Sequence, residues 1–221
     1  KAYRDSVVRM APKGKADPTV VLHTPGPLNE AYFEHVYIAR YLGINLLEGA
    51  DLTVRDNHVY LKTIEGLKEV DILLRRVDDA FSDPLELRKD STLGIAGLMQ
   101  AVRSGNVAVC NALGSSLLEV PAVASILPQA TQSILGEELI LPSVPTRWGA
   151  KEEDRRWMDA NLGTLKLLPA FGDMRKSIAL AELSEADREA SILRWKARPH
   201  EFVAIDTPVP STVPVYNMDR L

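Results

Sequence analysis

Two adjacent arginines, Arg75 and Arg76, follow an apolar run at residues 70–74. Guanidinium groups at the end of a buried strand are costly unless they are paired, and Asp78 and Asp79 follow at once. We therefore expect one arginine to pair with an aspartate and the other to bind a substrate carboxylate or phosphate through its planar fork. An internal ion pair that only closes the loop is the alternative.

A second segment suited to anion binding is the turn that begins at Thr24 and runs to Asn29. Thr24 and Asn29 can hydrogen-bond exposed backbone, and a helix that starts there presents free N–H groups to an anion. A role for Asn29 as a simple helix cap fits equally well. Glu34 and His35 are adjacent on that helix, so only one of them can face the site. A lone histidine such as His35 is more often packed or at the surface.

The third segment follows the apolar run at residues 107–110 and contains Asn111, Gly114 and Ser115. Glycine gives the backbone freedom, and hydroxyl groups beside it can contact a ligand. A single Gly-Ser turn is a weak signal by itself. Its place after a strand, like the other two segments, makes it a candidate for the same site.

The elements that must position these residues are short apolar strands that alternate with helices. The strands are expected at residues 20–22, 44–47, 70–74 and 107–110. This order predicts a parallel sheet over residues 18–142, in which ligands bind beyond the carboxyl ends of the strands. The three candidate loops should then meet at one edge.

Helix starts are expected at Asp83-Pro84 and at residues 90–92, with the second helix ending at Gly105. From residue 164 onward the pattern changes. Strands are predicted at 165–168, 178–181 and 202–205, and a helix at 184–195. Ser184 and Asp187 have the spacing of a capping pair at the start of that helix.

The same segments resemble a known family. In chain order they read TPG-x-x-N-x-x-YFEH, ARYLG, LLEGADL-x-VRD, VYLKT, LLRRVDD, DPLELR and NALGS. Over residues 18–212 they are similar to the bacterial circularly permuted ATP-grasp proteins, distant relatives of glutathionylspermidine synthase and glutathione synthetase. The resemblance implies an α/β fold, with an arm at 1–17, a Rossmann-like (pre-ATP-grasp) parallel sheet at 18–145 and a partial ATP-grasp lid subdomain at 146–221.

The resemblance also implies a function. The parent protein would use ATP and magnesium to activate a carboxylate as an acyl phosphate, which an amine then attacks to give an amide. The three candidate loops would bind the small-molecule carboxylate or amine substrate. The family's polypeptide extends beyond both ends of this chain, so we expect an internal fragment.

One segment departs from the family pattern. The residue before Pro169-Ala170, usually a cation that contacts ATP phosphates, is Leu168. The glycine-rich phosphate loop is replaced by residues 171–176, with a single glycine and with Arg175 and Lys176 as the remaining cations. We therefore expect no tight ATP binding by this chain alone and no metal site within it. A non-catalytic ATP-grasp-like binding or assembly module is the alternative function.

Composition excludes several other classes of protein. A net charge of −4 argues against non-specific nucleic-acid binding, and no window approaches the roughly 18 apolar residues of a membrane span. An oxidoreductase with a dinucleotide fingerprint is disfavoured because no G-x-G-x-x-G follows a strand. Cys110, the only cysteine, is typical of a buried strand position, which fits a cytoplasmic protein. The sequence leaves a homo-oligomer open.

Overall fold

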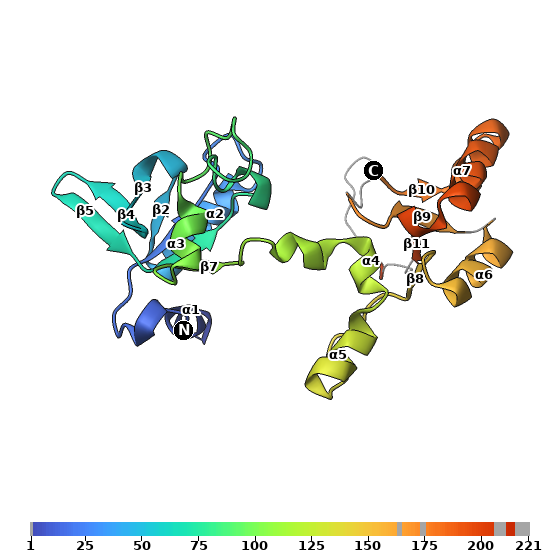
Figure 1. Cartoon of the computed structure of the whole chain (residues 1–221), viewed down its shortest axis with the longest axis horizontal. Helices are drawn as coiled ribbons and strands as arrows, with labels where there is room; N and C mark the ends of the chain where they lie inside the picture. The colour runs from blue at the N-terminus through green and yellow to red at the C-terminus, as the bar shows by residue number, and fades with distance from the viewer. Residues whose placement is uncertain (1, 163–164, 173–175, 206–210, 215–221) are drawn as a thin grey trace. The chain divides into compact units, whose positions relative to one another are not determined.

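The computed structural model describes residues 2–162, 165–172, 176–205 and 211–214. The chain divides into two compact units, Lys1–Ser115 and Ser116–Leu221 (Figure 1). This division falls earlier than the boundary near residue 145 expected from the sequence. The segment after residue 115 packs with the second unit, where the N–H of Ala122 donates to the carbonyl of Ala170 at 3.0 Å.

The first unit is built on a parallel sheet, as the sequence predicts. Its strands are β1 (Val20–His23), β2 (Asn45–Leu47), β6 (Ile72–Arg75) and β7 (Ala108–Cys110). Their order is β2-β1-β6-β7 and every neighbouring pair is parallel. Because the strands all run the same way, their carboxyl ends lie at one edge.

Both faces of this sheet are covered, which explains why its strands are continuous apolar runs. On one face Leu22 and Leu74 pack in a core cluster with side chains of α1 (Ala2–Val8) and α2 (Tyr32–Leu42). On the other face Val21 and Leu73 pack with α3 (Leu98–Arg103) and a second sheet. Alternate strand residues therefore serve two separate cores.

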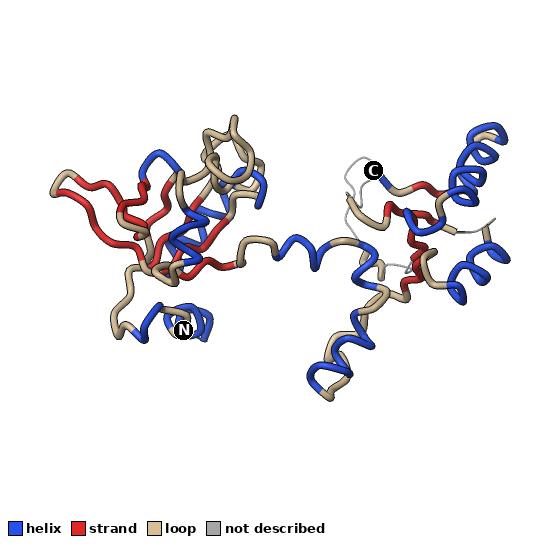
Figure 2. The backbone as a smooth tube through the Cα atoms, in the orientation of Figure 1, coloured by secondary structure: helices blue, strands red, loops and turns tan. Residues whose placement is uncertain are grey.

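The second sheet of the first unit is antiparallel and has three strands (Figure 2). They are β3 (Leu52–Arg55), β4 (His58–Thr63) and β5 (Gly66–Val70). Asp56 and Asn57 join β3 to β4 with φ angles of 48° and 62°, the left-handed conformation of a tight hairpin turn. Val59 and Val70 are fully buried and pack against the parallel sheet.

The prediction of a helix that starts at Asp83-Pro84 is wrong. The prediction that the next helix starts at residues 90–92 is also wrong. Residues 84–87 form a turn, and α3 begins only at Leu98. The buried Asp83 carboxylate accepts hydrogen bonds from the backbone N–H groups of Leu85, Gly97 and Met99 at 2.9–3.1 Å. Asp83 thus caps a helix that lies well after it in the sequence instead of starting its own.

The second unit is a four-stranded antiparallel sheet with helices. The strands are β8 (Thr146–Trp148), β9 (Lys166–Pro169), β10 (Ile178–Ala179) and β11 (Phe202–Ile205), in the order β10-β9-β11-β8. The helices are α4 (Pro121–Ala124), α5 (Leu127–Leu135), α6 (Glu152–Asn161) and α7 (Glu185–Ala197). β8 was not expected from the sequence. The predicted cap of α7 is confirmed, since the hydroxyl of Ser184 accepts from the N–H of Asp187 at 3.2 Å.

The sheet of the second unit also has two buried faces. Met158 of α6 and Trp195 of α7 pack on Leu167 on one face. On the other face Ala122 of α4 packs on Leu168. Gly149 is required after β8, because a Cβ there would lie 2.2 Å from a backbone carbonyl oxygen.

The buried end of β1 carries an unusual histidine. His23 is 0% exposed, and its Nε2 lies 2.9 Å from the carbonyl oxygen of Leu93, so Nε2 is the protonated donor. The Nδ1 atom has no hydrogen-bond partner among the described residues. Burial, helped by the nearby charge of Arg75, lowers the pKa of His23 to about 4. The imidazole is therefore neutral at pH 7.

We expect Asp83→Ala to lower the free energy of unfolding by about 2–4 kcal/mol, because three backbone N–H groups lose the buried carboxylate that accepts their hydrogen bonds. Urea unfolding of the chain measures the change. Asp90→Ala is the control: Asp90 is an exposed residue paired with Arg88, and its loss should have a much smaller effect. Equal destabilisation by the two substitutions would contradict the capping role of Asp83.

The neutral His23 predicts a stability that depends on pH. Its pKa is about 4 when folded and 6.5 when unfolded, so its contribution is complete above pH 6.5 and is lost as the pH falls towards 4. The loss should approach about 3 kcal/mol. His23→Gln removes the titration and should flatten the profile of unfolding free energy over this range. His58→Gln, at a partly exposed histidine, is the control for the loss of an imidazole elsewhere in the chain.

Candidate functional site

The three predicted loops meet at the carboxyl edge of the parallel sheet. β1, β6 and β7 are neighbours, and the loops at residues 24–29, 76–79 and 111–115 follow them directly. The N–H of Thr24 donates to the carbonyl of Leu47, and the N–H of Arg76 donates to the carbonyl of His23 at 2.8 Å. The predicted convergence is confirmed.

Arg75 is the internal arginine. Its side chain is 8% exposed and forms an ion pair of 2.5 Å with Asp79. The guanidinium also donates to the carbonyl oxygens of Val77, Asn111 and Ala112. The predicted internal pair is therefore confirmed, with Asp79 as the partner. These contacts hold the loop after β6 against the loop after β7.

The loop after β7 is tied back to the same ion pair. The N–H of Gly114 donates to Oδ2 of Asp79 at 3.1 Å, and Gly114 adopts a φ of 88° that favours glycine. The N–H of Ser115 donates to the carbonyl of Ala112. Asn111 is exposed, and its carbonyl oxygen, rather than its amide side chain, contacts Arg75. This loop is fixed in place by its backbone.

Arg76 differs from Arg75 in both burial and partners. Its side chain is exposed, and no carboxylate of the described residues forms an ion pair with it. Its charge acts on His35 of α2: burial, and after it the charge of Arg76, lowers the pKa of His35. Arg76 is therefore the arginine at this edge whose guanidinium is exposed to a ligand.

His35 is held by the turn after β1. Thr24 and His35 are 1% and 6% exposed, and Oγ1 of Thr24 lies 2.9 Å from Nδ1 of His35. The N–H of Gly26 donates to the same hydroxyl at 3.2 Å. Glu34 is exposed, so the two neighbours do face different ways. Thr24 is thus a residue that positions His35, a pairing that the sequence pattern did not reveal.

Asn29 is used within its own turn. Its Oδ1 accepts a hydrogen bond from the N–H of Ala31 at 3.0 Å, and its carbonyl accepts from the N–H of Tyr32, the first residue of α2. This geometry supports the alternative in which Asn29 shapes the start of the helix. The start of α2 lies beside Thr24 as a result.

The described residues of the second unit depart from the family's phosphate-binding pattern. Leu168 is 4% exposed and packs in an apolar cluster, where the family pattern has a cation. Lys176 is exposed in the second unit, and Arg175 lies outside the described residues. In the described part of the chain no three His, Cys, Asp or Glu side chains gather as metal ligands.

Two further features bear on the site. Burial raises the pKa of the Cys110 thiol, which lies 3.1 Å from the sulfur of Met10. Cys110 is therefore half-buried and packed in its strand, and its raised pKa disfavours the thiolate that a nucleophile needs. None of the helices in the described ranges combines the length and the apolar character that a membrane span requires.

Comparison with known proteins places this chain in a family. It is 40% identical over 215 residues to the uncharacterized protein Rv2411c of Mycobacterium tuberculosis, covering 97% of this chain and 38% of that protein. It is 36% identical to the uncharacterized protein Rv2567 of the same organism, over 97% of this chain and 24% of that protein. The uncharacterized protein sll0335 of a Synechocystis species is 40% identical over 73% of this chain and 34% of that protein.

The chain thus spans less than half the length of these relatives. The family model for circularly permuted ATP-grasp proteins of type 2 matches residues 1–221, the whole sequence. The mixed α/β architecture, with one parallel and two antiparallel sheets, agrees with that match. The chain belongs to the circularly permuted ATP-grasp type 2 family.

Proposed function

We propose that this chain is the substrate-binding part of an ATP-dependent carboxylate–amine ligase. ATP-grasp membership supports a ligase-type reaction. The resemblance also implies that the family is distantly related to glutathionylspermidine synthase, which favours amide or peptide bond formation. In this proposal the parallel-sheet unit is the Rossmann-like pre-ATP-grasp domain, preceded by the arm at 1–17, and the antiparallel sheet is part of the lid. The protein would act on small molecules in the cytoplasm.

The observation that carries the proposal is the exposed guanidinium of Arg76 on a rigid edge. The Arg75–Asp79 pair fixes the loops on either side, so Arg76 can bind an anion without first ordering its surroundings. Its planar fork matches a carboxylate through two parallel hydrogen bonds. The edge where it lies is also where ligands bind in open α/β sheets.

His35 would complete this carboxylate site. Its lowered pKa keeps the imidazole neutral at pH 7, so it offers hydrogen bonding beside Arg76 without adding a second charge. Thr24 fixes its ring through Nδ1, which leaves Nε2 as the nitrogen for a ligand. The N–H groups at the start of α2 favour an anion at the same place.

The second candidate function is a binding or assembly module without chemistry. The buried Leu168 favours it, because the strand that should present a phosphate-binding cation presents a core residue. In this alternative the loops at the carboxyl edge still bind a carboxylate, but no acyl transfer follows. Both candidate functions use the Arg76 site of this chain. They differ only in whether acyl transfer follows binding.

Arg76→Met should leave the free energy of unfolding nearly unchanged and abolish binding of acetate or sulfate at this edge. It should also raise the pKa of His35, because a positive charge beside the imidazole is removed. Proton NMR of the imidazole measures the pKa, and titration with the anion measures binding.

Arg75→Met is the matched comparison. It should destabilise the chain by about 3–5 kcal/mol, because the Asp79 carboxylate loses the guanidinium that forms an ion pair with it. If both substitutions destabilise equally and neither changes anion binding, the two arginines are structural and this edge is not the site.

Calorimetric titration of the chain with ATP and magnesium should show no micromolar affinity. Leu168 supplies no charge, and residues 171–176 contain a single glycine to wrap a phosphate. A micromolar affinity would refute this expectation and would assign phosphate binding to Arg175 and Lys176. In that event Lys176→Met should weaken the affinity.

A further inference from the structure

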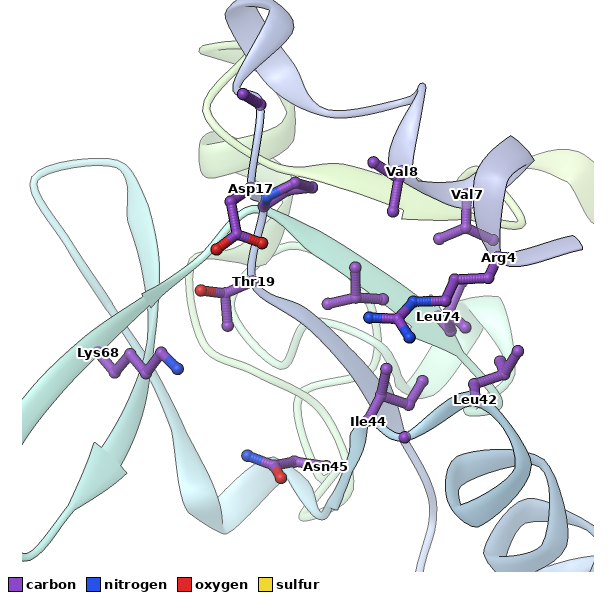
Figure 3. Close-up of a pocket in the computed structure, with 14 residues that line it drawn as sticks. Arg4, Val7, Val8, Asp17, Thr19, Leu42, Ile44, Asn45, Lys68 and Leu74 are labelled. Atoms are coloured by element: carbon purple, nitrogen blue, oxygen red, sulfur yellow. The ribbon is translucent and has the colours of Figure 1, made fainter. Parts of the chain in front are cut away.

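A cavity of about 270 Å³ lies at the opposite edge of the parallel sheet, where the strands begin. Its walls come from α1, from the segment that leads into β1, and from the corner between α2 and β2 (Figure 3). Thr19 directly precedes β1, and Asn45 is the first residue of β2. The cavity therefore lies at the amino edge of the sheet. It is therefore separate from the Arg76 site.

The inner wall of this cavity is apolar. Val7, Leu42 and Leu74 line it, and all three are buried members of the core cluster beneath α1 and α2. Val20 and Ile44 pack against the same cluster and also line the cavity. A ligand group that reaches this wall is stabilised by burial only if it is aliphatic.

The mouth of the cavity is charged. Arg4 and Lys68 point towards its middle from opposite sides, and Asp17 lies between them near Thr19 (Figure 3). All three charged side chains are exposed, and none forms an ion pair with a described residue. Lys15 differs, because it pairs with the buried Asp71 at 2.8 Å. The mouth therefore presents two cations and one carboxylate that are open to a ligand.

The segment that carries Asp17 is held firmly. Asp71 is 4% exposed and accepts hydrogen bonds from both Nζ of Lys15 and the N–H of Thr19, at 2.8 Å and 2.7 Å. These contacts tie residues 15–19 to the start of β6. Asp17 is thus placed over the cavity by its neighbours on both sides, which lowers the entropy cost of binding.

We propose that this cavity binds a small apolar amino acid. The ligand's carboxylate lies between Arg4 and Lys68, its ammonium group meets Asp17, and its aliphatic side chain packs on Leu42 and Leu74. The volume, near the lower end of small-molecule sites, suits one amino acid better than a nucleotide. The assignment goes beyond the proposed ligase function and is independent of it, because it uses neither Arg76 nor ATP.

The test titrates the whole chain with L-leucine, isocaproate and isoamylamine in a calorimeter. Isocaproate lacks the ammonium group and isoamylamine lacks the carboxylate. L-Leucine should bind saturably, and each analogue should bind at least about tenfold more weakly, because one charge of the mouth is left unmatched. Failure of L-leucine to bind a chain that is folded by circular dichroism overturns the proposal.

Single substitutions test which side chains bind the carboxylate and the ammonium group of the ligand. Arg4→Met should weaken L-leucine at least about tenfold, whereas Arg9→Met, just beyond the same helix and outside the cavity, should not. Asp17→Asn should weaken L-leucine but not isocaproate. Undiminished binding to Arg4→Met, or isocaproate binding as tightly as L-leucine, overturns the assignment. Arg76→Met should keep L-leucine binding, which separates this site from the ligase proposal.

Discussion

The ion pair between Arg75 and Asp79 is the contact on which the carboxyl edge of the parallel sheet depends. Arg75 bonds to Asp79 and to carbonyl oxygens of the loop after β7, and Asp79 accepts from the N–H of Gly114. A guanidinium with an 8% exposed side chain is stable only because these acceptors replace water. The side chain of the next residue, Arg76, is exposed.

Two buried histidines add a second constraint at this edge. His23 and His35 are 0% and 6% exposed, and burial lowers the pKa of both. A charged imidazole at either place would add repulsion to the positive field of Arg75 and Arg76. Keeping both rings neutral allows two arginines and two histidines to share one end of a small sheet.

The first unit thus offers two chemically different edges. The carboxyl edge is polar and fixed by backbone hydrogen bonds, with Arg76 as its exposed cation. The amino edge is a cavity with an aliphatic wall and a charged mouth around Arg4 and Asp17. The parallel sheet separates them, because both of its faces are filled by core side chains. Both candidate sites of the described residues lie near the ends of the strands.

The sequence by itself determined the parallel strands, the three loops that follow them and the cap of α7. These features follow from local patterns: apolar runs, turn residues and the spacing of Ser184 and Asp187. The tertiary structure decided which arginine is internal, because two acceptors of Arg75, the carbonyl oxygens of Asn111 and Ala112, come from the loop after β7. It also decided the role of Asp83. The carboxylate of Asp83 accepts from the N–H of Met99 in α3 and does not cap a helix at residue 84. Partners so distant in the chain leave no local pattern, so only the folded arrangement could select them.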